Sequence, residues 1–468
     1  MRLTTRQQAQ KIDQETFTRA EIHSEVLNSK QMMNLAAQKC IEIFFKVVKP
    51  KPTDQIVVFC GPGNNGNDGK IIAEILISQN YQCQCLDWQS LSFEEINHFK
   101  KYTFIIDAIF GIGLSRKLSD HDIQKLKLID DLDLPIFAVD TPTGLNIDTG
   151  FDWGYSLKAK WTCTIGWCKP GFYLNHGPEM CGQIFRAKLP YPQDIVSKNA
   201  STHFLMTQKM KRHFTPQRPN FSNKANYGNA IIVGSSQKYI GAGILSAIAA
   251  SRIGAGFVTL SPVEDFKNFK IEYPEFLYRP WNSLSEEIFQ SKKTRAIAIG
   301  PGLGKNADKL KIIKKLLNTH HRVVVDADAL VELSLIKKLN QNWLITPHRL
   351  ELSRILKVSE TEINQDPTHY AMIAAQRWNC VVLLKGYHTV IAYNDQCLII
   401  PTGNSALAKA GSGDVLTGII VGLLAQGLTP LRAASLATYL HGEIADNWIQ
   451  KGKANHSLMP TDLLNALI

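Results

Sequence analysis

A series of short apolar runs, each ended by a polar turn rich in glycine or proline, constrains the fold of this chain more than any other feature. In the first half the runs lie at 56–60, 102–106 and 135–139, and in the second half at 230–233, 255–260, 296–299, 323–325, 343–345 and 381–384. Continuous apolar runs of this length are typical of strands buried on both faces of a parallel sheet. The pattern predicts an α/β protein with mostly parallel, doubly wound sheets.

The length and the composition indicate two domains. With 468 residues, of which 44% are hydrophobic and 20% charged, the chain can bury more than one full core. Between 189 and 226 the sequence becomes polar and rich in proline, which is typical of a linker, and 204–211 has the pattern of a short connecting helix. We therefore predict a boundary near Lys198, with domains at 1–198 and 199–468.

The charge and the cysteine pattern favour an intracellular protein that acts on small molecules. The formal net charge is +11, but no block of Lys and Arg is interleaved with aromatic residues, as a nucleic-acid-binding face would need. The nine cysteines follow no zinc or disulfide spacing, and no apolar run approaches the ~18 residues of a membrane span. The N-terminus lacks the apolar region of a signal peptide. We expect a cytoplasmic protein with free thiols and no nucleic-acid or membrane partner, whose basic surface attracts phosphorylated molecules.

The segment Gly411-Ser412-Gly413-Asp414 is the strongest candidate for a catalytic site. The apolar run at 415–424 has the spacing of a buried helix, so a helix is predicted to begin at the glycines. Small residues there let a phosphate approach the unpaired first amides of the helix, at the positive end of its dipole. A carboxylate at such a place is useful if it takes a proton from a hydroxyl that attacks phosphorus. The alternative, an Asp that caps the helix in a tight turn, fits the local string equally well.

A glycine-rich segment at 61–69 follows the first predicted strand, and helical periodicity resumes at 70–76. Gly61, Gly63 and Gly66 match the dinucleotide-binding fingerprint, and Asp87 lies about 20 residues further on, where a ribose-binding acid is expected. The segment also carries four polar side chains, which belong to Asn64, Asn65, Asn67 and Asp68. Close approach of the backbone to a pyrophosphate does not require so many polar side chains. Their presence favours a site for a cation and a substrate.

Two further predicted strands end in similar turns. The run at 102–106 is followed by Asp107 and a segment with two glycines, and the run at 135–139 is followed by Asp140 and a turn that ends in Gly144. Ligands bind at the carboxyl ends of the strands in an open parallel sheet. We therefore expect these turns and the segment 61–69 to meet in one cleft.

The second domain resembles the ADP-dependent NAD(P)H-hydrate dehydratases of the ribokinase-like fold over nearly all of 215–468. The resemblance rests on the Gly-Ser-Gly-Asp segment and on the turns that follow the strands, such as 300–304, 326–330 and 346–348. It implies that Asp414 is the catalytic base and contacts the substrate, together with Ala242, Gly304 and His348. It implies a nucleotide site at Lys385, Gly386, Tyr387, His388, Thr389 and Gly413, and an anion hole at Gly411, Ser412 and Gly413. As a departure, Arg349-Leu350-Glu351 follow His348 where the family usually has Pro-Gly-Glu.

The first domain resembles the Rossmann-like NAD(P)H-hydrate epimerase domain over roughly residues 10–190. The matching segments are 64–68, 107–113, 140–144 and 169–171, with Asn67 in place of a glycine and Thr143 in place of a serine. The resemblance implies substrate binding by Asn64, Asn65, Gly66, Asn67, Asp68, Gly111, Ile112, Gly113, Leu114, Ser115, Arg116, Lys117 and Asp140. A potassium ion would bind at Asn65, Asp107 and Thr143. Asp140 is the candidate acid/base for epimerisation, and Asp68 is a second candidate.

Together the resemblances imply a bifunctional enzyme that repairs NADH and NADPH hydrated at the nicotinamide ring. The first domain would interconvert the R and S hydrates. The second would dehydrate the S hydrate with ADP as phosphoryl donor, giving NAD(P)H, AMP and phosphate. The implied cofactors are ADP, potassium and magnesium, and the partners are the two hydrates and ADP, with a homo-oligomer expected.

Three alternatives stay open from the residues. A vitamin-type or small-molecule kinase fused to a nucleotide-binding module would share the Gly-x-Gly-Asp end, but it would leave a stable phosphorylated product. The first domain could instead be a nucleotide-sensing or partner-binding module without chemistry, although Asp68, Asp107 and Asp140 together speak against this. An NAD-dependent dehydrogenase would turn over an alcohol or carbonyl substrate and would need no ADP.

Overall fold

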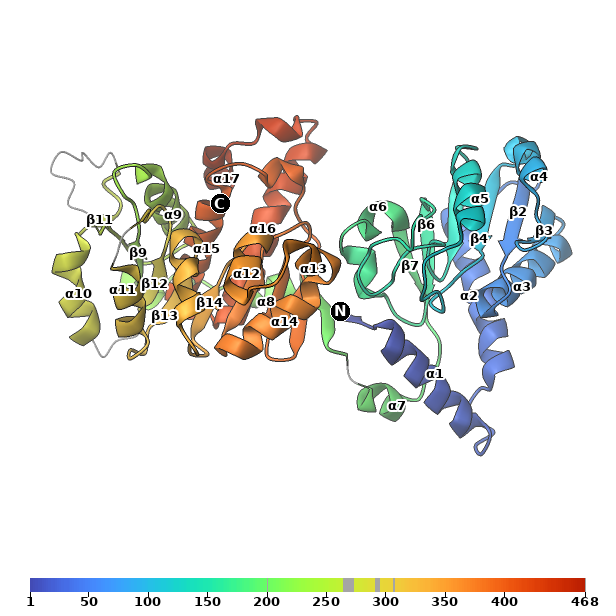
Figure 1. The fold of residues 1–468 in the computed structure, drawn as a ribbon, viewed down its shortest axis with the longest axis horizontal. Helices are drawn as coiled ribbons and strands as arrows, with labels where there is room; N and C mark the ends of the chain where they lie inside the picture. Colours follow the sequence, from blue (N-terminus) through green and yellow to red (C-terminus); the bar gives the residue numbers. More distant parts are fainter. Residues whose placement is uncertain (200, 264–272, 291–294, 306–307, 468) are drawn as a thin grey trace. The chain divides into compact units, whose positions relative to one another are not determined.

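The computed structural model of the chain describes all residues except 200, 264–272, 291–294, 306–307 and 468. The described chain forms two compact units (Figure 1). One spans Arg2–Phe204, and the other spans Leu205–Ile468 together with Met1. Each unit contains a mostly parallel sheet with helices on both faces, which confirms the predicted fold class.

The sheet of the first unit has the strand order β3-β2-β4-β5-β6-β7, and each neighbouring pair is parallel. The strands are β2 (Gln55–Cys60), β3 (Gln82–Asp87), β4 (Phe104–Ala108), β5 (Ile136–Val139), β6 (Trp161–Ile165) and β7 (Gln183–Ala187). The three apolar runs predicted in this half are the central strands β2, β4 and β5. Strand β6 alternates apolar and polar residues, so it gave no continuous apolar signal.

Helices cover both faces of this sheet. α2 (Ser29–Val47) and α3 (Asn64–Ser78) pack on one face, and α4 (Phe93–Asn97) and α5 (Asp120–Asp130) pack on the other. Helix α3 begins at Asn64 and not near Lys70, as the periodicity had suggested. The polar residues of the glycine-rich segment therefore occupy the first two turns of a helix, because Gly61 and Gly63 already make the turn from β2.

The ends of the first unit pack against each other. α1 (Arg6–Ala20) contacts α7 (Gln193–Lys198), and β1 (Arg2–Leu3) pairs in antiparallel fashion with β8 (His203–Leu205) (Figure 1). A satellite apolar cluster of Ile12, Met32, Trp167, Tyr191, Ile195 and Val196 joins these elements to the segment after β6. A short helix, α6 (Gly177–Cys181), precedes β7. Residues distant in the sequence thus reach the end of the sheet where β6 stops.

The sheet of the second unit runs in the order β17-β16-β15-β14-β13-β12-β9-β10-β11. Its strands are β9 (Asn229–Val233), β10 (Phe257–Ser261), β11 (Leu277–Tyr278), β12 (Ala296–Ile299), β13 (Arg322–Val325), β14 (Trp343–Ile345), β15 (Val381–Leu384), β16 (Val390–Tyr393) and β17 (Gln396–Ile399). The strands from β11 to β15 are parallel, whereas β16 and β17 form an antiparallel edge. The six apolar runs predicted here are all strands.

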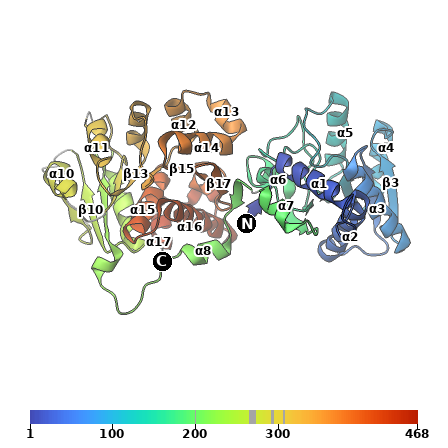
Figure 2. The ribbon, with the colours of Figure 1, turned by 90° about the horizontal axis from the view of Figure 1, so that it is seen from below.

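Two layers of helices enclose this sheet (Figure 2). One layer contains α15 (Ser412–Ala425), α16 (Pro430–Gln450) and α17 (Pro460–Ala466), and α9 (Ile240–Arg252) packs against α15. The other contains α10 (Trp281–Gln290), α11 (Lys309–Leu316), α12 (Arg349–Leu356), α13 (Glu360–Gln365) and α14 (Pro367–Trp378). α8 (Gln208–Phe214) begins later than the predicted 204–211, because Phe204 belongs to β8.

Close packing of α15 against α9 depends on glycines in α15. A Cβ atom added to Gly418 would lie 2.2 Å from the carbonyl oxygen of Ser246 and 2.6 Å from Cβ of Ala249. We expect Gly418→Ala to lower the free energy of unfolding by about 1–3 kcal/mol, because overpacking outweighs the helix propensity of alanine. Gly241→Ala in α9, where a Cβ would meet nothing within 4 Å, should change it little. Denaturant unfolding of both variants checks this, and equal losses would contradict it.

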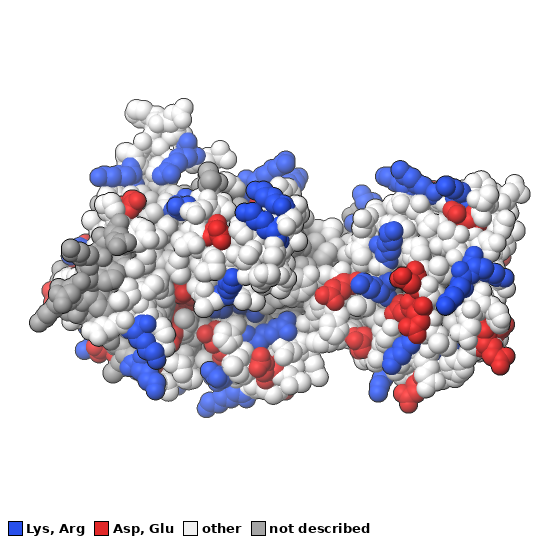
Figure 3. Space-filling view, turned by 90° about the horizontal axis from the view of Figure 1, so that it is seen from above, with Lys and Arg blue, Asp and Glu red and all other residues white. Residues whose placement is uncertain are grey.

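The described surface carries mixed charge. On the face shown in Figure 3, Lys and Arg are scattered among Asp, Glu and uncharged residues on both units. All nine cysteines are free, as expected. Among the helices that the structure describes, none combines the length and apolarity needed to cross a membrane.

Candidate active sites

A cavity of about 680 Å³ opens at the carboxyl ends of the strands of the first unit. The strands β2, β4, β5 and β6 each contribute the turn that follows them, as the sequence predicted for the first three. The lining residues are Thr4, Ala9, Gln10, Asp13, Pro62, Gly63, Asn64, Asn65, Asp68, Ile109, Phe110, Gly111, Ile112, Gly113, Leu114, Ser115, Arg116, Asp140, Ile165, Trp167, Lys169 and Tyr191. The volume is that of a small-molecule site.

Two glycines bring the turns after β2 and β4 into contact. A Cβ on Gly61 would lie 1.9 Å from the carbonyl oxygen of Ile109, and a Cβ on Gly66 would lie 1.8 Å from the carbonyl oxygen of Gly61. A side chain at Gly61 would push apart the turns after β2 and β4, and a side chain at Gly66 would push α3 away from the turn after β2. These glycines therefore act in packing, and they place the polar side chains of α3 at the cavity wall.

Asp140 lines the cavity and lies at the centre of a buried polar network. Its carboxylate accepts a hydrogen bond from Lys169 Nζ at 2.7 Å and from the backbone N–H groups of Ile165 and Ile112 at 3.2 and 3.3 Å. Lys169 is only 2% exposed and also donates to Thr164 and to the carbonyl of Ile165. Asp140 has φ +65°, a conformation unusual for an Asp, which the network maintains.

Asp68 and Asn65 face the same cavity with unsatisfied polar atoms. Asn65 Oδ1 and Nδ2 and Asp68 Oδ1 are buried without a hydrogen-bond partner. Burial, with the nearby charge of Asp140, raises the pKa of Asp68 to about 8. Unpartnered buried polar groups cost free energy unless a ligand satisfies them, so these atoms mark a binding surface.

Asp107 is fully buried at the end of β4 and pairs with Thr143. It accepts hydrogen bonds from the backbone N–H of Thr143 at 2.7 Å and from the Thr143 hydroxyl at 2.6 Å. Burial raises the pKa of Asp107 to about 6, and these hydrogen bonds lower it in part. The pair joins the turns after β4 and β5.

The cavity gathers most of the residues predicted for this unit. Asn64, Asn65, Asp68, the segment 111–116 and Asp140 line it. Gly66, Asn67 and Lys117 are not among the lining residues, and Asn67 is exposed. Asp87, the acid of the dinucleotide fingerprint, is exposed at the end of β3 and accepts hydrogen bonds from its own turn.

The sequence did not single out several lining residues. Lys169 carried a signal, since it lies in the segment 169–171, which resembles the family. No signal distinguished Asp13, Trp167 or Tyr191. Asp13, for example, lies on an amphipathic helix, where an Asp is usually a solvated surface residue. The satellite cluster of α1, α7 and the segment after β6 places them at the cavity.

The second unit presents Asp414 in the first turn of α15, as predicted. Gly411 has φ +91° and begins the helix, and the Ser246 hydroxyl donates to the carbonyl of Asp414 at 2.8 Å. Burial, followed by the charge of Asp326, raises the pKa of Asp414 to about 7, while Lys385 lowers it. A carboxyl with this pKa can exchange a proton near neutral pH.

A buried carboxylate, Asp326, joins the turns after β13, β14 and β15 to helix α15. It accepts hydrogen bonds from Thr346 and Thr417, both at 2.7 Å, and from Lys385 Nζ at 3.0 Å. Burial alone would raise the pKa of Asp326, but Lys385 and the two hydroxyls lower it overall. The sequence named this residue only as part of a turn; its partners come from three separate segments.

Lys385 connects this network to the predicted nucleotide site. Burial alone would lower the pKa of Lys385, but Asp326 and Glu351 raise it overall, so the side chain is a cation. Its Nζ lies 3.8 Å from Glu351 and 4.0 Å from the position that a Cβ on Gly413 would take. The Lys385 cation therefore lies beside the N-terminus of α15, so an anion bound there would be stabilised both by the lysine and by the helix N-terminus.

His348 caps helix α12. Its backbone N–H donates to Glu351 at 2.7 Å, and its ring nitrogen accepts from the N–H of Glu351. The departure at Arg349 and Leu350 leaves this capping box intact, and the Arg349 side chain lies 3.4 Å from the Cβ position of Gly386. His348 therefore has a structural role as a helix cap, while its ring is half exposed.

The other predicted residues of this unit lie on neighbouring turns. A Cβ on Gly302 would approach Ala242 at 2.9 Å, and the N–H of Gly304 donates to Asp328 at 2.8 Å. Thr389 is buried, and its hydroxyl donates to the carbonyl of Gly386 at 3.3 Å. Tyr387 and His388 form a ring pair with centroids 4.4 Å apart. Ser412 contacts the buried ring of His441 at 3.2 Å, a partner that the sequence did not suggest.

Each half of the chain matches the model of a known protein family. Residues 230–468 match the family model described as NAD(P)H-hydrate dehydratase, and residues 29–97 and 86–171 match the model described as YjeF-related protein N-terminus. A bifunctional NAD(P)H-hydrate repair enzyme of Moorella thermoacetica is 32% identical over 459 residues, covering 88% of this chain and 86% of the relative. A repair enzyme of the same description from Escherichia coli is 30% identical, covering 88% and 84%.

Solved structures resemble the second unit. The ADP/ATP-dependent NAD(P)H-hydrate dehydratase of Bacillus subtilis, co-crystallised with ATP and Mg²⁺, has a TM-score of 0.52 at 33% identity and covers 56% of this chain and 96% of its own. A ribokinase-like superfamily protein of Enterococcus faecalis has a TM-score of 0.50 at 28% identity, with coverages of 57% and 94%. Both likenesses agree with a ribokinase-like second unit.

Proposed function

Because this chain belongs to the family of bifunctional NAD(P)H-hydrate repair enzymes, we propose that it restores NADH and NADPH that have been hydrated at the nicotinamide ring. The first domain interconverts the R and S hydrates. The second dehydrates the S hydrate with ADP as phosphoryl donor and releases NAD(P)H, AMP and phosphate. The observation that carries the proposal is the pair of separate sites, one around Asp140 and Lys169 and the other around Asp414.

The second domain has the groups that dehydration by phosphoryl transfer requires. Hydroxide is a poor leaving group, and transfer of the terminal phosphoryl group of ADP to the ring hydroxyl converts it into phosphate. Asp414 takes the hydroxyl proton while the amides at 411–413 and Lys385 stabilise the charge on the transferred group. The ring nitrogen then expels phosphate, and loss of a proton from the neighbouring carbon restores the double bond. Ala242, Gly304 and His348 position the hydrate, and the segment 385–389 holds the nucleotide.

Magnesium would reach this site with the nucleotide. Among the described residues, no group of three or more His, Cys, Asp or Glu side chains is arranged to hold a metal ion. Asp326 is already occupied by Lys385 and two threonine hydroxyls. Magnesium commonly binds through substrate phosphates and one or two carboxylates, and it would supply charge neutralisation here.

In the first domain, Asp140 is the acid/base next to the hydrated carbon. Support comes from its position in the cavity wall, its ion pair with Lys169 and two backbone N–H groups that fix its orientation. Residues 64–68 and 111–117 would hold the rest of the hydrate, with Arg116 and Lys117 near its phosphates. Asp68 faces the same space and is the second candidate for proton transfer.

A potassium ion fits part of its expected site at Asn65, Asp107 and Thr143. The side-chain oxygen of Asn65 is buried and unpartnered, as an oxygen ligand waiting for a cation would be. Asp107 has accepting capacity left beyond its hydrogen bonds to Thr143 and Ile109, since a carboxylate offers four lone pairs. The ion would offset the charge of carboxylates and phosphates gathered in one cleft.

Replacing sodium by potassium at constant ionic strength should therefore raise the melting temperature of the first unit. When the potassium concentration is 100 times the dissociation constant of the site, binding adds about 2.7 kcal/mol to the free energy of unfolding. Asn65→Ala should abolish the difference between the two salts, whereas Asn67→Ala, at an exposed position in the same helix turn, should preserve it. Scanning calorimetry of the three proteins in KCl and NaCl measures this. Identical salt responses in all three would rule out the site.

The proposed function is tested by recovery of the nicotinamide absorbance from mixed R and S hydrates. With the intact chain, we expect full recovery that requires ADP or ATP. Accumulation of a stable phosphorylated product without recovery would refute the repair function and favour the kinase alternative. Recovery without any nucleotide would refute the phosphoryl-transfer step.

Three further assignments complete the proposal. We place the epimerase in residues 1–198 and the dehydratase in 199–468, supported by the extent of the first compact unit and of the family models. A cytoplasmic location is supported by the nine free cysteines. A homo-oligomer remains a prediction.

A further inference from the structure

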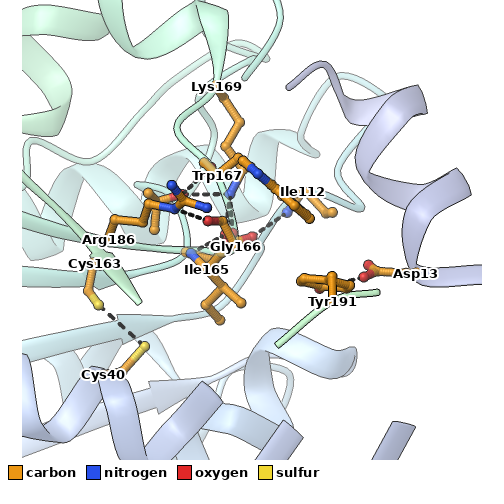
Figure 4. A network of polar contacts seen from close by, with 12 residues as sticks. Asp13, Cys40, Ile112, Cys163, Ile165, Gly166, Trp167, Lys169, Arg186 and Tyr191 are labelled. Carbon is orange, nitrogen blue, oxygen red and sulfur yellow. Dashed lines mark hydrogen bonds and ion pairs between the residues drawn. The ribbon is translucent and has the colours of Figure 1, made fainter. Parts of the chain in front are cut away.

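Asp13 and Tyr191 form a polar pair at the cavity of the first unit that the proposed function leaves without a role. The Tyr191 hydroxyl donates to Asp13 Oδ1 at 2.6 Å, and both residues line the same cavity as Asp140 and Lys169. Figure 4 shows the pair coming from a helix and a segment separate from those that carry Lys169. Asp13 and Tyr191 therefore form an acid–base assembly on elements different from those that carry Asp140 and Lys169.

The pair is held rigidly. Tyr191 packs on Trp167 with ring centroids 4.7 Å apart, inside the satellite cluster that also contains Ile12 of α1. Further along the same helix, Arg19 forms an ion pair with Asp194 of α7 at 2.6 Å. A side chain fixed by packing and by a hydrogen bond is preorganised for proton transfer.

The surroundings of Asp13 allow it to act as an acid near neutral pH. Burial raises its pKa to about 6, the Tyr191 hydroxyl lowers it in part, and the charge of Asp140 raises it. Asp140, by contrast, is held in an ion pair with Lys169. Asp13 and Asp140 are thus two carboxyl groups with different partners in one cavity, a common arrangement for an acid and a base that act together. Asp68 lines the same cavity, but its buried Oδ1 has no hydrogen-bond partner that would fix it for such a role.

We propose that Asp13, assisted by Tyr191, is a second catalytic acid–base group of the epimerase, acting on the ring face opposite to Asp140. The inference rests on the proposed function of the first domain. Inversion of the hydrated carbon requires the hydroxyl to leave from one face and to be delivered to the other. A single carboxylate reaches one face, so two groups on different elements meet the requirement.

The step balances with water as the only co-reactant. The hydrated carbon adjoins the ring nitrogen, because water adds to an enamine at the carbon that carries nitrogen. The acid protonates the hydroxyl, the carbon–oxygen bond breaks with its electron pair leaving on water, and the nitrogen lone pair forms a C=N bond. A second water attacks from the opposite face, the C=N pair returns to nitrogen, and the other carboxylate takes the released proton. Proton exchange with solvent resets both groups.

The test follows each purified hydrate in ¹⁸O-labelled water without nucleotide, with chromatographic separation of the epimers and mass detection of the label. In Asp13→Asn we expect interconversion to fall about 100-fold or more, as for loss of an acid–base group. Asp140 should still exchange the hydroxyl on its own face, so the label should enter one epimer without inversion. Asp140→Asn should show the complementary pattern, with the label in the other epimer. Tyr191→Phe, which keeps the ring in its stack, should show a smaller loss.

Glu15→Gln is the matched control on the same helix. Glu15 accepts a hydrogen bond from Asn199 Nδ2 and does not line the cavity, so Glu15→Gln should leave interconversion and exchange as in the intact chain. An interconversion rate of Asp13→Asn within a few-fold of the rate of the intact chain would overturn the proposal. Loss of label exchange in both epimers by Asp13→Asn would also overturn it, since this result would indicate that Asp13 has only a structural role. Absence of interconversion in the intact chain would instead refute the epimerase function itself.

Discussion

Replacing Asp414 by Asn is expected to lower the rate of S-hydrate dehydration by about 100- to 10,000-fold. Asn keeps the shape of the side chain at the start of α15 but cannot take the hydroxyl proton. The Asn side chain fits the same surroundings, so the helix and its contact with Ser246 through the backbone carbonyl should be retained. The measurement is single-turnover dehydration of the pure S hydrate with saturating ADP. Interconversion of R and S hydrates should be unchanged in the same protein.

The pH dependence gives an independent check on Asp414. Burial and the charge of Asp326 raise its pKa to about 7, and the base must be ionised to act. The value of kcat/KM for dehydration should therefore increase with pH, with a midpoint near pH 7, because protonation at lower pH inactivates the base. Asp395→Asn, at an exposed turn of the same unit, should keep both rate and profile. A wild-type rate in Asp414→Asn would refute the role of Asp414 as base.

Lys169→Met should abolish epimerisation and destabilise the first unit by about 3–5 kcal/mol. The substitution keeps the apolar stem but leaves the Asp140 carboxylate buried without its cation, since the two side chains are only 2% and 9% exposed. For a unit of this size the loss corresponds to about 2–4 °C of melting temperature per kcal/mol. Dehydration of the pure S hydrate should continue, so recovery from mixed hydrates should stop near half.

The control for this variant is Lys39→Met. Lys39 pairs with Glu42 at 2.8 Å on an exposed helix face, where an ion pair contributes at most about 1 kcal/mol. Calorimetry and the epimer assay on both variants separate a buried pair from a surface pair. Epimerase activity near the wild-type level in Lys169→Met would show that the ion pair is dispensable for the reaction.

The sequence by itself determined the architecture and the ends of the strands. Short continuous apolar runs that end in polar turns predicted central strands, and parallel strands end at the same edge, so Asp107, Asp140 and the segment from Asn64 were expected to converge. The helix beginning at Gly411 followed from small residues before an apolar run, and the structure places Asp414 in its first turn. These inferences rely on local pattern and on a general rule of sheet topology.

The tertiary structure alone decided which further side chains complete each site. Lys169 reaches Asp140 because β5 and β6 are adjacent, and Lys385, Thr346 and Thr417 meet at Asp326 from three segments. Asp13 faces the cavity only because α1 packs on the satellite cluster, and nothing in its own segment distinguishes it from a solvated Asp. Local pattern records which residues are apolar or flexible. The partner of a polar side chain is set by packing between segments distant in the sequence, which no local pattern encodes.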